Sequence, residues 1–169
     1  MKKTLLFLLI IVFFGQSITA QNKLRLPSLV SDNMVIQQST LINIWGWAEK
    51  KKNVEITTSW NNALQLTQSD KEGKWKTTLN TPAAGGPFNI KISSNKDTIS
   101  IENVMVGEVW LASGQSNMEM PIKGNSSEPI NGNNELILYS KNPNIRMFTV
   151  KRNSSPQPVV DCVGTWKES

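Results

Sequence analysis

Histidine is absent from the 169-residue sequence, and cysteine occurs only once. Histidine is the most frequent general base in enzymes and the most frequent metal ligand. These residues therefore lack the usual general base and the usual metal ligand. The single cysteine, Cys162, cannot form a disulfide within these residues, and we interpret it as a small buried hydrophobic residue. We therefore expect neither a metal site nor a cofactor.

The balance of charge gives no indication of a nucleic-acid partner. The chain has 18 Lys and Arg against 13 Asp and Glu, a formal net charge of +5. Its longest basic run is the three lysines at residues 50–52, which follow Glu49. A run this short, in front of a predicted strand, is typical of a solvated hairpin tip. With 38% hydrophobic residues, the composition is that of a globular protein.

Residues 1–20 have the three regions of a signal peptide. Lys2 and Lys3 form a basic region, an apolar run follows, and small residues up to Ala20 form a cleavage site. The apolar run is shorter than the ~20 residues that a membrane span requires. We predict cleavage after Ala20, a secreted or periplasmic protein, and no membrane association after cleavage. The alternative is that the segment is retained as a single anchor.

Residues 21–103 alternate apolar and polar side chains with the period of β-strands. Val54, Ile56 and Trp60 fall on one face of a predicted strand, with polar residues between them. Turn sequences at residues 61–62, 70–73 and 94–97 separate this strand from others that are equally short. The pattern predicts an antiparallel β-sandwich. Its expected core side chains are Trp60, Trp75, Phe88, Ile90 and Ile92.

Two further tryptophans lie on the opposite strand face from the core. Trp45 and Trp47 alternate with Ile42 and Ile44, which we expect to point inward. An outward pair of tryptophans favours either an interface with the next domain or a platform on which a sugar stacks. The sequence leaves both interpretations open.

Residues 104–112 form a nearly continuous apolar run, which predicts a central strand of a parallel sheet. The polar residues 113–117 follow at its carboxyl end, where ligands bind in open α/β sheets. Gly114 permits a sharp turn there, and Ser116 then lies where free backbone N–H groups can stabilise an oxyanion. Ser116 is therefore the candidate nucleophile, although such a sequence is also an ordinary polar turn.

The longer string Gly-Glu-Val-Trp-Leu-Ala-Ser-Gly-Gln-Ser-Asn-Met-Glu, residues 107–119, resembles the nucleophile block of the sialate O-acetylesterase family. These are serine esterases of the SGNH (GDSL-like) superfamily. The resemblance implies that Ser116 is the nucleophile and that its backbone N–H is one oxyanion donor. Gln115 and Asn117 become candidates for substrate binding. The implied substrate is O-acetylated sialic acid or another acetylated sugar.

The same resemblance implies that residues 104–169 are the start of an SGNH-type parallel α/β sheet. A short helix at residues 135–139 and a strand at residues 145–150 fit that order of elements. The polar loop at residues 124–134 is either one wall of a substrate cleft or a surface loop without a role. The sequence indicates no particular oligomeric state.

A serine nucleophile needs a base, and the residues near Ser116 offer poor ones. Glu108 and Glu119 are close in sequence, but an ordinary carboxylate is a weak base toward a hydroxyl group. The family's Asp-x-x-His element is not recognisable in these residues. We therefore expect a truncated, inactive N-terminal portion of such an esterase. The rival hypothesis is a non-catalytic carbohydrate-binding or interaction sandwich with a remnant nucleophile block.

Overall fold

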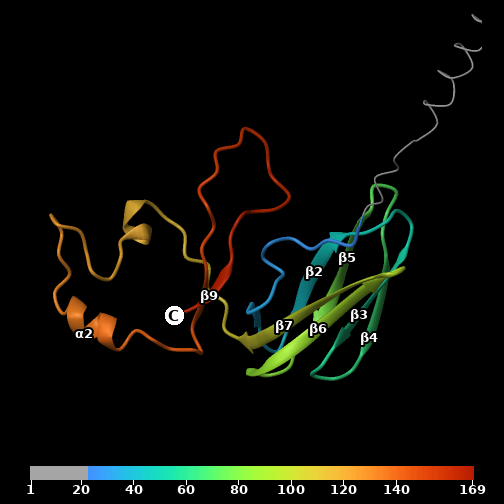
Figure 1. The fold of residues 1–169 in the computed structure, drawn as a ribbon, viewed down its shortest axis with the longest axis horizontal. Coiled ribbons are helices and arrows are strands. Elements are labelled where there is room, and N and C mark those ends of the chain that lie inside the picture. The colour runs from blue at the N-terminus through green and yellow to red at the C-terminus, as the bar shows by residue number, and fades with distance from the viewer. Residues whose placement is uncertain (1–22) are drawn as a thin grey trace, which may run out of the picture.

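The computed structural model describes residues 23–169, so the predicted signal peptide lies outside the described residues. The described chain is mostly β-sheet (Figure 1). A five-stranded sheet has the order β1-β7-β6-β3-β4, and a two-stranded sheet pairs β2 with β5. The strands are β1 (Val35–Gln37), β2 (Leu41–Trp47), β3 (Asn53–Thr58), β4 (Leu64–Gln68), β5 (Lys74–Asn80), β6 (Gly85–Ser94) and β7 (Asp97–Gly107).

The larger sheet is mixed, whereas the sequence predicted purely antiparallel pairing. Strand β3 pairs antiparallel with β4, and β6 with β7, across short turns, and β3 also pairs antiparallel with β6. Strand β1 instead lies parallel to β7, with Val35 opposite Met105. Pairing of two segments so far apart in the chain has no local sequence signal, which is why the prediction missed it.

Both sheets contribute to one buried core, as the alternation of apolar residues predicted. Ile44 of β2, Ile56 of β3 and Ile92 of β6 are each at most 2% exposed. Trp75 of β5 is buried among them, which confirms its predicted inward position. Trp60 was expected within a strand, but β3 ends at Thr58. Trp60 therefore lies in the following turn, where it is half-buried and packs edge-on against Phe88.

The predicted strand at residues 104–112 is wrong beyond its first half. Residues 104–107 are the end of β7, where Val104 and Val106 are buried. Residues 108–115 have no regular secondary structure, and Trp110 and Leu111 are 87% and 94% exposed. The apolar run thus combines a strand end with an exposed segment, and composition alone does not separate the two. The predicted domain boundary after residue 103 falls within β7, which runs from Asp97 to Gly107.

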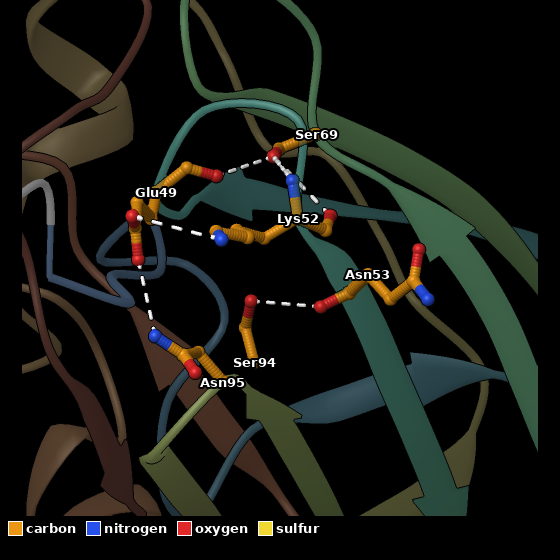
Figure 2. Close-up of polar contacts among 6 residues, drawn as sticks. All are labelled: Glu49, Lys52, Asn53, Ser69, Ser94 and Asn95. Carbon is orange, nitrogen blue, oxygen red and sulfur yellow. Dashed lines mark hydrogen bonds and ion pairs between the residues drawn. The ribbon is translucent and has the colours of Figure 1, made fainter.

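The lysines of residues 50–52 lie at a tip where three turns meet (Figure 2). Ser69 is 2% exposed, and its hydroxyl donates to the Glu49 carbonyl at 2.5 Å and accepts from the Lys52 N–H at 3.0 Å. Glu49 also accepts from Asn95 at 3.1 Å, while Ser94 donates to the Asn53 carbonyl. These contacts join the turns, so we interpret the tip as structural, with exposed lysines.

Beyond β7 the chain leaves the sheets and forms only short elements (Figure 1). These are the 3-10 helix η2 (Ser116–Glu119), the helix α2 (Asn133–Leu138) and the strands β8 (Arg146–Phe148) and β9 (Trp166–Glu168). The predicted helix and strand are confirmed in outline. However, β8 pairs antiparallel with β9 and with no other described strand, so the expected parallel sheet is not present in residues 23–169. In this described part, no helix has the length and apolarity to span a membrane.

Candidate functional site

Ser116 is the first residue of η2, on the exposed segment that follows β7. Gln115 precedes it in an extended conformation, and its carbonyl accepts from the Met118 N–H at 2.9 Å. A Cβ at Gly114 would lie 2.6 Å from the Met118 side chain, so glycine permits that side chain to fold back against the loop. The predicted turn after Gly114 is therefore present, and it leaves Ser116 at the surface.

The three predicted site residues lie together on this turn. Gln115, Ser116 and Asn117 are consecutive and all exposed. No carboxylate or other side chain is hydrogen-bonded to any of them in the described part of the chain. The geometry can present a hydroxyl group to an incoming ester, but it does not itself activate that hydroxyl.

Glu119 forms an ion pair with Arg152, which lies 33 residues further along the chain. Its Oε1 accepts from Arg152 Nε at 2.9 Å, and its Oε2 contacts Arg152 Nη2. This pairing with Arg152 lowers the pKa of the Glu119 carboxyl below its ordinary value. A lower pKa makes the carboxylate a weaker base. Glu119 therefore fixes the end of η2 rather than serving Ser116.

Glu108 is held in a similar way at the start of the loop. Its two oxygens accept from Gln37 Nε2 at 3.0 Å and Gln38 Nε2 at 2.7 Å, and these bonds lower the pKa of its carboxyl. Gln37 also accepts from the Val109 N–H at 2.9 Å. The pair of glutamines at the end of β1 thus fixes the direction in which the chain leaves β7. Sequence reasoning missed both glutamines and Arg152, because their contacts are long-range.

Several exposed apolar side chains lie close to Ser116 in the sequence. The exposed side chains of Val109, Trp110 and Leu111 precede it, and Met118 follows it. A separate groove is lined by residues between 150 and 163, including Arg152 and Cys162, but not by Ser116. Cys162 is half-buried and unpaired among the described residues, so the prediction that it is buried was only partly right. Across residues 23–169, no group of three or more Cys, Asp or Glu is placed to bind a metal.

The C-terminal segment contacts residues 28–33, which precede β1. Trp166 Nε1 donates to the Leu29 carbonyl at 2.9 Å, and the Ser28 N–H donates to Asp161 at 3.0 Å. Arg146 reaches the backbone carbonyl of Asn33 at 3.1 Å. These contacts connect the strands that follow the nucleophile loop with the sheet that precedes it.

Sialate O-acetylesterases of mammals resemble this chain in sequence. It is 28% identical to the sialate O-acetylesterase of Mus musculus over 146 residues, which cover 81% of this chain and 26% of that protein. It is 26% identical to the sialate O-acetylesterase of Homo sapiens, over 82% of this chain and 28% of that protein. The chain therefore spans about a quarter of the length of these relatives. No family model matches the sequence.

The fold has a solved counterpart. A carbohydrate acetylesterase from Xanthomonas citri aligns with a TM-score of 0.76 and 28% identity, over 86% of this chain and 32% of that chain. The similarity covers most of this chain and about a third of the solved one.

Proposed function

From its similarity to sialate O-acetylesterases and to a carbohydrate acetylesterase, we propose that the chain belongs to a sialate O-acetylesterase-like family and that Ser116 is the nucleophile of an esterase that removes O-acetyl groups from sialic acid or a related sugar. The observation that carries the proposal is the position of Ser116. It stands exposed at the first residue of η2, directly after the Gly114 turn, in a block that resembles the family's nucleophile sequence.

The reaction follows from ordinary serine chemistry. The Ser116 Oγ attacks the acetyl carbonyl carbon while a base takes its proton, and the carbonyl oxygen becomes an oxyanion. The backbone N–H of Ser116 is a donor for that oxyanion. Collapse of the intermediate releases the sugar hydroxyl and leaves an acetyl group on Ser116. Water then attacks the acyl-enzyme and releases acetate. Gln115 and Asn117 flank the serine and would contact the sugar.

We propose that the base comes from outside these 169 residues. The sequence has no histidine, and both nearby carboxylates are engaged: Glu108 by Gln37 and Gln38, and Glu119 by Arg152. In this proposal the sheets up to Gly107 are a β-sandwich domain, and residues after it begin an SGNH-type hydrolase domain. The 169-residue chain alone would then be an inactive N-terminal portion.

Acetate release from O-acetylated sialic acid tests this proposal. The 169-residue chain should release no more acetate than its Ser116→Ala variant. A polypeptide lengthened by the reading frame that follows codon 169 should hydrolyse the ester and lose that activity on Ser116→Ala. Removal of a triad base in other serine hydrolases costs about 10⁴ to 10⁶-fold in rate, so the contrast is large. Rapid Ser116-dependent turnover by the short chain would contradict the proposal.

A second candidate is a non-catalytic carbohydrate-binding protein, favoured by the absence of histidine from all 169 residues. In that case the sandwich would bind sugar and the nucleophile block would be a remnant. An inactive lengthened polypeptide that still binds sugar would favour this candidate.

A further inference from the structure

A groove on the sandwich, away from the nucleophile loop, combines an aromatic ring with a positive charge. Its volume is about 650 Å³, and its lining residues are Lys23, Leu24, Arg25, Trp47, Glu72, Thr98 and Ile99. None of Gln115, Ser116 or Asn117 lines it. The mechanism proposed above makes no use of these residues.

Arg25 lies over the ring of Trp47 at one side of the groove. The guanidinium carbon is 3.7 Å from the centre of the indole ring, the distance of a cation–π contact. The two residues also exchange both backbone hydrogen bonds, each 2.8 Å long. Backbone pairing and the cation–π contact together hold the guanidinium group beside the groove.

The hydrogen-bond donors of this guanidinium are not consumed. Within residues 23–169, its side chain makes no hydrogen bond, and its nearest carboxylate is Asp161 at 3.9 Å. Asp161 accepts from the backbone N–H groups of Ser28 and Cys162 through Oδ1, and its Oδ2 faces Arg25 Nη1 in a long ion pair that leaves the guanidinium N–H groups without a hydrogen bond among the described residues. The Arg25 side chain is 57% exposed, so the edge of its guanidinium group is open to solvent. A planar fork of this kind matches the two oxygens of a carboxylate.

The remaining lining favours a sugar acid over a simple anion. Leu24 and Ile99 give the groove an apolar side, while Thr98 offers a hydroxyl group. Lys23 adds a second positive charge, and the lining carboxylate, Glu72, is paired with Lys74 at 2.9 Å. Apolar surface suits the C–H face of a pyranose, and the net positive charge suits its carboxylate.

We propose that the Arg25–Trp47 groove binds a carboxylate-bearing sugar, with Arg25 holding the carboxylate. The site is separate from Ser116 and would retain acidic glycan chains near the nucleophile-bearing segment. The choice of sugar acid rests on the proposed function; the charge and geometry of the groove do not.

Titration with N-acetylneuraminic acid, followed by tryptophan fluorescence and by NMR shifts, tests the proposal on the 169-residue chain. We expect saturable binding that weakens at least about tenfold in Arg25→Ala, because a charge-assisted bidentate contact is lost. Arg25→Lys should fold alike yet still bind more weakly, since an ammonium group cannot form the two parallel bonds. The methyl ester of the same sugar should bind as weakly as the acid binds to Arg25→Ala.

Lys91→Ala is the matched control, because it removes one positive charge from an exposed position of β6 outside the groove. It should bind the acid as the parent does. Ser116→Ala should also bind normally, which separates this groove from the esterase proposal. Absence of saturable binding, equal binding of acid and methyl ester, or equal effects of Arg25→Ala and Lys91→Ala would overturn the proposal.

Discussion

Arg146 Nη2 donates to Asn103 Oδ1 at 3.0 Å and so joins β8 to β7 of the five-stranded sheet. Its Nη1 donates to the backbone carbonyls of Asn33 and Asn103, and the Arg146 side chain is only 4% exposed. Asn33 and Asn103 both have positive φ angles, 65° and 56°, a conformation that asparagine tolerates well. Their side chains are bonded to each other at 2.7 Å. The backbone carbonyls of Asn33 and Asn103 and the Asn103 side chain thus form a polar site for the Arg146 guanidinium group, which we call the asparagine socket.

Arg146→Ala should lower the free energy of unfolding by about 1–3 kcal/mol, because the socket carbonyls lose buried donors. Urea denaturation followed by tryptophan fluorescence measures this change. The control is Arg152→Ala, which removes an exposed, solvent-screened ion pair with Glu119 and should change the free energy of unfolding much less. Equal effects of the two variants would show that the socket does not stabilise the fold.

Limited proteolysis should leave a resistant core that ends near Gly107. Residues 104–107 belong to β7 and pair with both β1 and β6, whereas η2 and α2 contain no buried residue. We expect the first cuts in the exposed loops at residues 124–134 and 153–160, and faster trimming in Arg146→Ala. Mass spectrometry of the fragments gives the boundary. A resistant fragment made of residues 108–169 alone would refute this division.

Stability in acid should depend on Asp70. Its carboxylate accepts from the backbone N–H groups of Lys74 at 2.9 Å and Glu72 at 2.8 Å. The bond from Lys74 is the main cause that lowers the pKa of Asp70 below 3.8. A lowered pKa stabilises the fold above the ordinary value, and this contribution is lost as the pH falls through the folded value.

The melting temperature of the parent and of Asp70→Asn, measured between about pH 7 and pH 2, tests this dependence. The asparagine keeps an acceptor for the same turn but cannot titrate. The advantage of the parent should therefore shrink as the pH falls below about 4. A difference that stays constant across the range would rule out the contribution from Asp70.

Export is a further prediction, and it rests on the sequence of residues 1–20 alone. Mass spectrometry of protein recovered from outside the cytoplasm should show a mature chain that begins at Gln21. Replacing Leu8 and Leu9 with aspartate should block export, because the apolar region would be interrupted. Recovery of only the intact Met1 form in the cytosol would contradict the prediction.

Local patterns predicted the core residues and turns before Gly107 better than the segment after it. Alternation correctly identified Ile44, Ile90 and Ile92 as core residues, and the turn at residues 94–97 indeed joins β6 to β7. These features depend on neighbours in sequence. The parallel pairing of β1 with β7 depends on contacts between distant segments, which no local pattern encodes.

For the candidate site, too, the sequence predicted the local features but not those that depend on distant residues. The Gly114 turn and the exposed Ser116 could be predicted, because both follow from the residues themselves. The end of the strand at Gly107 could not, since residues 109–111 are as apolar as a buried strand yet lie at the surface. The role of Arg146 could not be predicted either, because its hydrogen-bond partners, Asn33 and Asn103, are far from it in the sequence.

The most direct test of the central claim is to locate the acetyl group on the protein during turnover. The lengthened polypeptide would be mixed with O-acetylated sialic acid, quenched in acid and digested, and its peptides analysed by mass spectrometry. We predict an acetyl group on Ser116 that forms during turnover, disappears once substrate is exhausted, and is absent from Ser116→Ala. Acetate release by Ser116→Ala at the parental rate, with the acetyl group on another residue, would contradict the assignment of Ser116 as the nucleophile.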